Sequence, residues 1–565
     1  MEILDWIVLL GTLLTIVAYG TWKTRGSKNV DDYIKGGNEA KWWTIGLSVM
    51  ATQASAITFL STPGQAFHDG MGFVQFYFGV PIAMVVICLV FIPLYHRLKV
   101  YTAYEFLENR FDLKTRSLTA MLFLIQRGLA AGITIYAPAI ILSAVLGWNL
   151  NLLIVIIGIL VIIYTVSGGT KAVSITQKHQ MVVIFTGMFV AFFIIVSKLP
   201  ADITFTKALD IAGASGKMDI LDFSFDFNNR YTFWSGIIGG TFLALSYFGT
   251  DQSQVQRYLS GKSIKEMQMG LIFNGLLKVP MQFFILLVGV MVFVFYQFNA
   301  SPVSFNPDAS KTVLSSSYAQ EYQTIEAEQA VIFNDKQELI KLYTETQDEK
   351  YSELINAANK KDRENREAAK VIIKKASDEK KLSVETNDKD YVFIHFILNN
   401  LPRGLIGLLL AVILSAAMSS TASELNALSS TTTMDLYKRS IVKDKDDTHY
   451  LKASKWFTFG WGVLAILIAC IAYLADNLIQ LVNIIGSIFY GNVLGIFLLA
   501  FFFKYVKANA VFIAALITQA IVIIGWWYDW MPYLWLNLFG CALVVLIAYF
   551  IQVISLNNNS PEKIK

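Results

Sequence analysis

The chain has 565 residues, of which 55% are hydrophobic and only 16% are charged, and its formal net charge is +4. Average globular domains carry far more charge, so this composition excludes an ordinary soluble protein and predicts an all-α polytopic membrane protein. The small net charge gives no indication of nucleic acid binding. Three cysteines, all in apolar segments, support neither a disulfide framework nor a metal cluster.

Apolar segments that are long enough to cross a bilayer as helices, which takes about 20 residues, recur along the chain. We count thirteen predicted spans, at 4–22, 44–66, 72–96, 117–146, 151–167, 179–198, 232–256, 268–297, 391–433, 452–475, 479–502, 508–528 and 533–555. The first span follows Met-Glu-Ile-Leu-Asp, which lacks the basic residues and cleavage site of a signal peptide. We therefore expect it to be retained as a membrane helix.

An odd number of spans places the two termini on opposite sides of the membrane. Lys and Arg are concentrated in the short loops that follow odd-numbered spans. The short loops of the other side hold only four of these residues, Lys198, Lys207, Lys217 and Arg230. Because cytoplasmic loops carry the excess of positive charge, we expect a cell-membrane protein whose N-terminus is outside and whose C-terminus is cytoplasmic.

The segment 299–390 differs in composition from the rest of the chain. No glycine occurs from Ala300 to Arg403, and residues 310–383 are rich in Ala, Glu, Lys, Gln and Leu. This pattern predicts one or two solvated amphipathic helices outside the membrane. Two interpretations stay open, a docking or lid element and an insertion that covers little of the protein.

Signatures of enzymes are missing from the sequence. There is no Walker A motif, and the five histidines are scattered without the spacing of metal ligands. The Gly168-Gly169 pair lacks the rest of a dinucleotide fingerprint. We therefore expect a protein that is not an enzyme and that uses no organic cofactor.

The ninth predicted span is rich in hydroxyl groups, with ten Ser and Thr side chains between Ser415 and Thr433. No water reaches such groups inside a bilayer, so they must face a partner helix, a cavity or an ion. The adjacent hydroxyls of Ser419 and Ser420, with the carbonyl of Ala416 one turn earlier, offer neutral oxygen ligands to a hard monovalent cation. The alternative is that the hydroxyls bond back to carbonyls of their own helix or permit close helix packing.

The second predicted span is interrupted by polar residues between Thr52 and Thr62 and by Pro63-Gly64 near its outer end. Discontinuous membrane helices expose backbone carbonyls that can coordinate a cation near the bilayer midplane. Together with the hydroxyl-rich span, this break predicts an ion site between two helices.

Four segments resemble the sodium:solute symporter family, in the order and spacing of that family. They are ATQASAITFLSTPG (51–64), TAYEFLENRF (102–111), GTDQSQVQRYLSGK (249–262) and LPRGLIGLLLAVILSAAMSSTASELNALSS (401–430). The resemblance covers essentially the whole chain except 299–390. It implies two inverted five-helix repeats, at 42–198 and at 232–298 with 391–502. The segments 1–23 and 508–555 would then be accessory membrane helices, and 299–390 a charged extracytoplasmic helical insert.

The resemblance also implies two sets of site residues. The implied sodium ligands are the backbone carbonyls of Ala51, Ala54 and Ala416 and the hydroxyls of Ser419 and Ser420. The implied substrate-contacting residues are Gln53, Ser55, Thr58, Phe73, Gln75, Tyr77, Tyr247, Lys278 and Asn483. Phe73 and Tyr77 could instead be ordinary aromatic residues of a helix interface. Lys278 is harder to explain structurally, because an ammonium inside an apolar span is costly. Arg127 is similar in kind and could pair with an anionic solute.

Some relatives hold a second sodium ion with an aspartate on the fifth core helix. Gln177 replaces that carboxylate here, Lys178 adds a positive charge beside it, and Ala422 replaces a hydroxyl, although Ser423 remains. A neighbouring ammonium opposes a cation in a low-dielectric site, so we expect one sodium ion per transport cycle unless Glu424 compensates.

The function implied by the resemblance is sodium-coupled symport of a small polar organic solute, such as a sugar, a sialic acid or a monocarboxylate, by alternating access. Its partners would be the solute, sodium and the lipid bilayer, with no obligate protein partner. Alternatives are a transporter-like membrane sensor and a sodium-independent permease or channel.

Overall fold

The computed structural model describes residues 2–23, 33–34, 36–226, 229–382, 384–471 and 478–558, and the elements in these ranges are helices. The α-helices are, in chain order, α1 (Ile3–Lys23), α3 (Trp42–Gln53), α4 (Ala56–Asp69), α5 (Gly79–Val86), α6 (Ile92–Leu98), α7 (Glu105–Arg110), α8 (Leu113–Leu146), α9 (Leu150–Ser197), α10 (Phe205–Ala214), α11 (Gly240–Gly249), α12 (Gln252–Leu259), α13 (Ile264–Phe298), α14 (Pro307–Leu314), α15 (Ala319–Thr346), α16 (Glu349–Glu379), α17 (Lys389–Asn400), α18 (Leu405–Thr431), α19 (Asp447–Ile471), α20 (Leu478–Phe502), α21 (Ala508–Trp527) and α22 (Tyr533–Asn558). Shorter 3-10 or π-helical segments join them: η1 (Gly36–Asn38), η2 (Met71–Tyr77), η3 (Ile87–Phe91), η4 (Ser235–Gly239) and η5 (Thr432–Ile441).

Ten helical segments of the described residues are long and apolar enough to cross a membrane, and the bent pair of α3 and α4 makes an eleventh. Two shorter apolar helices, Ile3–Ile16 and Ser235–Gly249, lie in the first and seventh predicted spans. The prediction of an all-α polytopic membrane protein is confirmed, whereas the count of thirteen spans stays a prediction. The last residues of the tenth predicted span, 472–475, lie outside the described residues.

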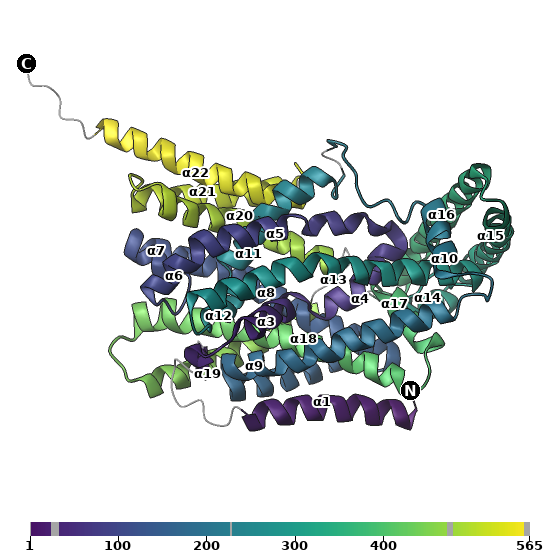
Figure 1. Cartoon of the computed structure of the whole chain (residues 1–565), viewed down its shortest axis with the longest axis horizontal. Coiled ribbons are helices and arrows are strands. Elements are labelled where there is room, and N and C mark those ends of the chain that lie inside the picture. Colours follow the sequence, from purple (N-terminus) through teal and green to yellow (C-terminus); the bar gives the residue numbers. More distant parts are fainter. Residues whose placement is uncertain are drawn as a thin grey trace, which may run out of the picture.

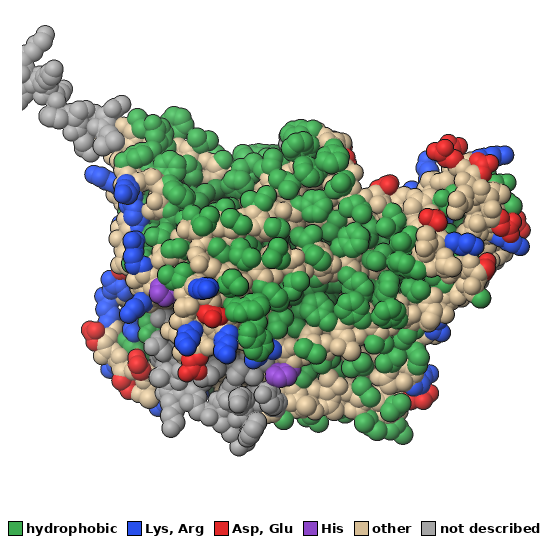
Figure 2. Space-filling model, viewed as in Figure 1, with side chains coloured by type: hydrophobic (Ala, Val, Ile, Leu, Met, Phe, Trp, Pro, Cys, Tyr) green, Lys and Arg blue, Asp and Glu red, His purple; other side chains and the backbone are tan. Residues whose placement is uncertain are grey.

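The helices run roughly parallel to one another and form an elongated bundle (Figure 1). Helix α1 lies along one edge of the bundle, and α21 and α22 lie along the opposite edge. The chain begins at the end where α15 and α16 project, whereas α22 ends at the other end. On the face shown in Figure 2, hydrophobic side chains cover the middle of the molecule and charged side chains gather at its two ends. This pattern is the one that a bilayer requires.

The second predicted span is broken between α3 and α4, which meet at an angle of 61°. Ala54 leaves the helical conformation (φ −85°, ψ 75°), and Ser55 is extended. The break lies at these two residues and not at Pro63-Gly64, which are both inside α4. Gly64 instead permits close packing, because a Cβ there would lie 1.8 Å from the carbonyl oxygen of Lys389 at the start of α17.

The seventh predicted span is also interrupted. Helix α11 ends at Gly249 and α12 begins at Gln252, and the side chain of Asp251 between them accepts a hydrogen bond from the backbone N–H of Ser253 (2.9 Å). This carboxylate therefore caps the N-terminus of α12. The first span of each predicted repeat thus contains a break.

The ninth predicted span, 391–433, consists of two helices rather than one. Helix α17 ends at Asn400 and α18 begins at Leu405. Pro402 has no N–H to continue a helix, and Gly404 adopts a positive φ of 84°, which disfavours other residues. The hydroxyl-rich segment lies entirely in α18 and in η5, which follows α18 directly.

The insert consists of α14, α15 and α16, and it has a small apolar core of its own around Val313, Tyr322 and Ile373. Polar contacts tie it to the membrane helices. Gln337 donates to the carbonyl of Phe298 at the end of α13 (3.1 Å), and Ser352 donates to the carbonyl of Ala214 at the end of α10 (3.2 Å). The insert therefore covers the end of the bundle at which the chain begins.

Candidate functional site

Three of the five predicted sodium ligands, Ala51, Ala416 and Ser420, lie close together where α18 passes α3. The hydroxyl of Ser420 lies 3.0 Å from the carbonyl oxygen of Ala416 and 3.5 Å from the carbonyl oxygen of Ala51. The hydroxyl oxygen of Ser419 is buried and has no hydrogen-bond partner among the described residues. Buried polar atoms are normally satisfied, so this unpartnered hydroxyl is available to a ligand or an ion.

The alternative interpretation of the serines is also partly realised, since Ser420 bonds back to a carbonyl of its own helix one turn earlier. That bond does not explain the contact of Ser420 with Ala51, which belongs to another helix. Among the described residues, no group of three or more His, Cys, Asp and Glu side chains could hold a metal ion.

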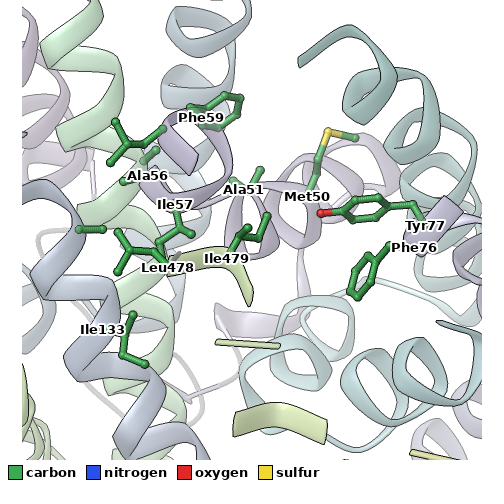
Figure 3. Close-up of a cluster of buried hydrophobic side chains, with 14 of the residues drawn as sticks. Met50, Ala51, Ala56, Ile57, Phe59, Phe76, Tyr77, Ile133, Leu478 and Ile479 are labelled. Atoms are coloured by element: carbon green, nitrogen blue, oxygen red, sulfur yellow. The ribbon is translucent and has the colours of Figure 1, made fainter. Parts of the chain in front are cut away.

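A cavity of about 80 Å³ lies beside this group. Its lining residues are Thr52, Gln53, Ser55, Ile57, Thr58, Phe76, Tyr77, Arg127, Thr134, Leu243, Tyr247, Ser420, Glu424, Ile479, Val482, Asn483 and Tyr490. Six of the predicted substrate-contacting residues are in this set: Gln53, Ser55, Thr58, Tyr77, Tyr247 and Asn483. Figure 3 shows part of the apolar surroundings, with Ile57 and Ile479 next to each other and Tyr77 and Phe76 on the other side of Ala51.

Polar atoms that face the cavity differ in how far they are satisfied. The side-chain oxygen of Gln53 is buried without a hydrogen-bond partner. The amide of Asn483 donates to the carbonyl of Ile479 (2.7 Å), and the phenol of Tyr247 accepts from Gln254 (2.5 Å). A solute with hydrogen-bond donors would satisfy the oxygen of Gln53.

Three predicted substrate residues do not line this cavity. Gln75 is used structurally, because it donates to the carbonyl of Tyr231 (3.0 Å) and accepts from the N–H of Asp222 (2.9 Å). Phe73 packs edge-on against Tyr231 (4.9 Å between ring centroids). Lys278 is completely buried, its ammonium lies 5.2 Å from the centre of the Tyr77 ring, and it has no hydrogen-bond partner among the described residues.

Arg127 lines the cavity, and it is surrounded by acidic groups. Its guanidinium forms ion pairs with Asp251 and with Glu424 (3.0 Å to the latter) and donates to the phenol of Tyr490 (2.7 Å). All four side chains are buried, and together they carry a formal charge of −1 when both carboxylates are ionised and the phenol of Tyr490 is neutral. Two carboxylates therefore already pair with the guanidinium of Arg127, which the sequence suggested as a partner for an anionic solute.

Sequence reasoning missed Asp251 and Tyr490 in this cluster. Asp251 was visible in the segment GTDQSQVQRYLSGK, but only the break after α11 turns its carboxylate toward Arg127 on α8. A charged residue at the end of an apolar span was the available signal.

A second polar cluster surrounds Gln177 on α9. Its amide N–H₂ group donates to Thr52 (3.1 Å) and to Ser423 (3.0 Å), and its carbonyl accepts from Ser48 (2.5 Å). The side-chain amide of Gln177 thus forms hydrogen bonds with hydroxyl groups of both α3 and α18. The ammonium of Lys178 lies over the ring of Trp43 (4.6 Å), and Glu424 pairs with Arg127 instead of joining this cluster.

The sequence of the chain is similar to those of known membrane transporters. The family model of the sodium:solute symporter family matches residues 33–327 and 369–518. The chain is 26% identical to the sodium/sialic acid symporter SiaT of Proteus mirabilis (strain HI4320), over 96% of this chain and 93% of that protein. It is 32% identical to the human sodium/iodide cotransporter and 34% identical to the human sodium-coupled monocarboxylate transporter 1. These two matches cover 50% and 48% of this chain but only 44% of each transporter.

The fold agrees with a solved structure of a Na⁺-coupled sialic acid symporter in its substrate-bound outward-open state. The TM-score is 0.76, the sequence identity is 23%, and the alignment covers 98% of both chains. The family model leaves out residues 328–368, which form the distal parts of α15 and α16. Since the family model matches most of the sequence on both sides of that insert, the chain belongs to the sodium:solute symporter family, whose coupling ion is sodium.

Proposed function

We propose that this protein is a symporter that uses a sodium gradient to carry a small polar organic solute across the cell membrane by alternating access. One observation carries the proposal: the hydroxyl of Ser420 lies against the carbonyl oxygens of both Ala51 and Ala416, beside the orphan hydroxyl of Ser419. We infer that sodium binds to these oxygens together with the carbonyl of Ala54.

Sodium at this position would link α18 to the break between α3 and α4. An ion that holds two helices together favours the conformation in which their oxygens are close, and its loss favours the other conformation. The cavity shares Ser420 with the sodium site, so solute and ion would each stabilise the same arrangement. Thermodynamic linkage requires that sodium tighten solute binding by the same factor by which solute tightens sodium binding.

The solute would bind among the amides of Gln53 and Asn483, the hydroxyls of Ser55 and Thr58 and the ring of Tyr247. Amides and hydroxyls suit the hydroxyl and carboxylate groups of a sugar, a sialic acid or a monocarboxylate. The cavity of about 80 Å³ is smaller than ordinary ligand pockets of about 300–1,000 Å³. We therefore expect the lining side chains to move apart when the solute enters.

Uptake into proteoliposomes tests the proposal. Labelled N-acetylneuraminate, lactate and glucose would be offered with and without an inward sodium gradient. We expect at least one solute to accumulate only with the gradient, and the Ser419→Ala/Ser420→Ala variant to need a higher sodium concentration for half-maximal uptake. Ser430→Ala is the matched control, because Ser430 is buried on the same helix and donates to the carbonyl of Ala427 in the preceding turn (3.0 Å).

The rival functions give different results in this assay. A sodium-independent permease would equilibrate a solute equally well without a sodium gradient. A membrane sensor would bind a solute without moving it. Unchanged sodium dependence in the double alanine variant would refute the proposed sodium site even if uptake were coupled to sodium.

A further inference from the structure

A larger cavity lies at the end of the bundle that the insert covers. Its volume is about 400 Å³, against about 80 Å³ for the central cavity. Its walls come from the end of α4, the loop after α10, the end of α13, and α15 and α16 of the insert. We call this cavity the vestibule, and its volume is within the range of ordinary ligand sites.

Basic groups outnumber acidic groups in the vestibule. The lining cations are Lys217, Lys336, Arg363 and Arg366, and the lining anions are Asp69 and Asp362. Each of the two carboxylates is already paired. Asp362 contacts Lys336 (2.8 Å) and Arg366 (2.9 Å), and Asp69 contacts Lys389 outside the vestibule (2.6 Å).

Lys217 and Arg363 are the two lining cations that these pairs leave over, and of the two only Lys217 is buried. It is 8% exposed, and its ammonium donates to the backbone carbonyl of His68 (2.5 Å) and lies 4.8 Å from the centre of the Phe293 ring. Within the described part of the chain, it forms no ion pair with a carboxylate. A buried ammonium that forms no direct ion pair is costly, so a bound anion would relieve part of that cost.

Besides Nε2 of His68, three further polar atoms of the vestibule are buried without hydrogen-bond partners among the described residues. They are the hydroxyl of Ser215, the amide nitrogen of Asn359 and the amide oxygen of Gln297. Native proteins rarely leave such atoms unsatisfied unless a ligand or water uses them. The first two can donate hydrogen bonds, whereas the Gln297 oxygen needs a donor. Phe67, Phe293 and Phe333 add apolar surface beside them.

We propose that the vestibule is a second solute-binding site, which takes a small organic anion with a carboxylate and at least one hydroxyl or amide donor. The carboxylate is held by Lys217 and by the donors of Ser215 and Asn359, and the solute donates to Gln297. Its place on the outer face, before the central cavity, rests on the proposed function. Eight of the eighteen lining residues lie in the segment 328–368, which the family model leaves out.

Cysteine protection in the full-length, reconstituted protein tests this site. Asn356 is exposed on α16 and lines the vestibule, whereas its neighbour Ala357 is also exposed and does not line it. Asn356→Cys and Ala357→Cys would be made in a Cys470→Ser background, because Cys88 and Cys541 are buried. The modification rate by a charged maleimide would be measured with N-acetylneuraminate, lactate, iodide or no added anion.

We expect N-acetylneuraminate or lactate to slow the modification of Asn356→Cys and to leave Ala357→Cys unchanged. Iodide, which carries no donor, should protect less. Lys217→Gln should raise the solute concentration needed for protection about tenfold or more, as expected for the loss of a charged hydrogen bond. Gln297→Leu, which removes the free acceptor together with the N–H₂ group that donates to the carbonyl of Phe293 (3.0 Å), should weaken N-acetylneuraminate binding more than iodide binding.

The Ser419→Ala/Ser420→Ala variant separates this inference from the proposed function. Protection that persists in this variant supports the vestibule site, even if no solute proves to be coupled to sodium. If protection disappears with the central sodium site, it arises from binding at the central site and not from a solute in the vestibule. That result would overturn the inference. Sodium-driven uptake without any protection of Asn356→Cys would overturn the vestibule and leave the proposed function standing.

Discussion

At the scale of single residues, Lys278 has the least compensated charge in the interior. It is fully buried, and Asn274 and Gln282, at spacings of four along α13, also have unpartnered polar atoms. Residues at this spacing lie on one face of a helix. The ammonium of Lys278 lies 5.2 Å from the centre of the Tyr77 ring, which lines the central cavity. A movement of that ring would bring the ammonium toward the solute.

We therefore predict that Lys278→Ala impairs transport more than a lysine-to-alanine change in the segment 299–390, for example Lys350→Ala. The reason is that a buried ammonium inside an apolar span is retained for a function, whereas Lys350 is solvated. Initial uptake rates, normalised to the amount of inserted protein, measure the difference. Equal rates in the two variants would contradict the prediction.

Gln177 determines the predicted number of coupled ions. Its amide donates to Thr52 and Ser423 and leaves no formal negative charge to attract a second sodium ion. We predict one sodium ion per transport cycle, measured from the reversal potential of solute-dependent current or flux. Gln177→Ala should leave that number at one. A value of two that falls in this variant would show that a second sodium site is active.

Lys217 makes the vestibule sensitive to pH. Burial lowers the pKa of Lys217 from 10.5 to about 8, and nearby Arg363 and Lys336 add to the effect while Asp69 and Asp362 oppose it. Because the folded pKa is depressed, the folded protein binds fewer protons at this residue than the unfolded chain between about pH 8 and pH 10.5.

An anion binds best to the charged form of Lys217, so its affinity should be constant well below pH 8 and fall as the pH rises through that value. The charged and titratable groups that face Lys217 are His68 and Asp69 on α4, Lys336 on α15, and Asp362 and Arg363 on α16. The concentration of N-acetylneuraminate that protects Asn356→Cys would be measured at pH 6.5 and pH 9.5. Lys217→Gln should show a much smaller change, and an unchanged pH dependence in that variant would assign the titration to another group.

At the scale of elements, local patterns predicted the first helix break but not the second. Polar residues inside an apolar span indicated the region around Ala54. Pro63-Gly64 suggested a break near the outer end of that span, but both residues lie inside α4. The break at Thr250–Asp251 follows from a cap that becomes visible only when α12 is seen as a separate helix. The pairing of Arg127 with Asp251 and Glu424 joins three helices that are distant in sequence, so no local pattern could predict it.

The insert is the element whose removal is most informative. Ser317, just before α15, is in contact with Glu379, the last residue of α16 (3.3 Å from the Ser317 nitrogen to the carboxylate). A short linker can therefore join the two ends. We predict that replacing 319–378 by a Gly/Ser linker preserves sodium-dependent uptake, because the sodium ligands lie on α3 and α18. The same change should raise the concentration of an anionic solute needed for half-maximal uptake.

Uptake kinetics at varied sodium and varied solute concentration separate the two effects. The unaltered chain and Lys360→Ala, a change of an exposed residue on α16, are the controls. A loss of sodium dependence in a normally inserted deletion variant would mean that the insert takes part in coupling.

At the scale of the whole molecule, charged and apolar side chains are separated. Charged side chains gather at both ends of the apolar belt (Figure 2), and one end carries the insert. Composition and hydrophobic length were sufficient to predict an all-α membrane protein, because a bilayer restricts spanning chains so strongly. They could not predict which polar groups meet inside it.

We predict that the insert is extracytoplasmic and that the opposite end is cytoplasmic. In intact cells, a membrane-impermeant maleimide should label Glu364→Cys on α16 and should not label Arg439→Cys in η5 until the membrane is permeabilised. Both positions are exposed in the structure, so access and not burial decides the outcome. The reverse labelling pattern would invert the proposed orientation.

The amide of Gln177 has a consequence for how steeply a solute can be concentrated. One sodium ion that moves down a tenfold gradient provides about 1.4 kcal/mol, and a membrane potential of 100 mV adds about 2.3 kcal/mol for its charge. With one ion per cycle, an uncharged solute could reach an accumulation of roughly 500-fold under these conditions. A solute with one negative charge cancels the charge of the ion, loses the contribution of the potential, and stops near tenfold. For an anionic solute, Gln177 thus decides whether the membrane potential drives accumulation or transport is electroneutral.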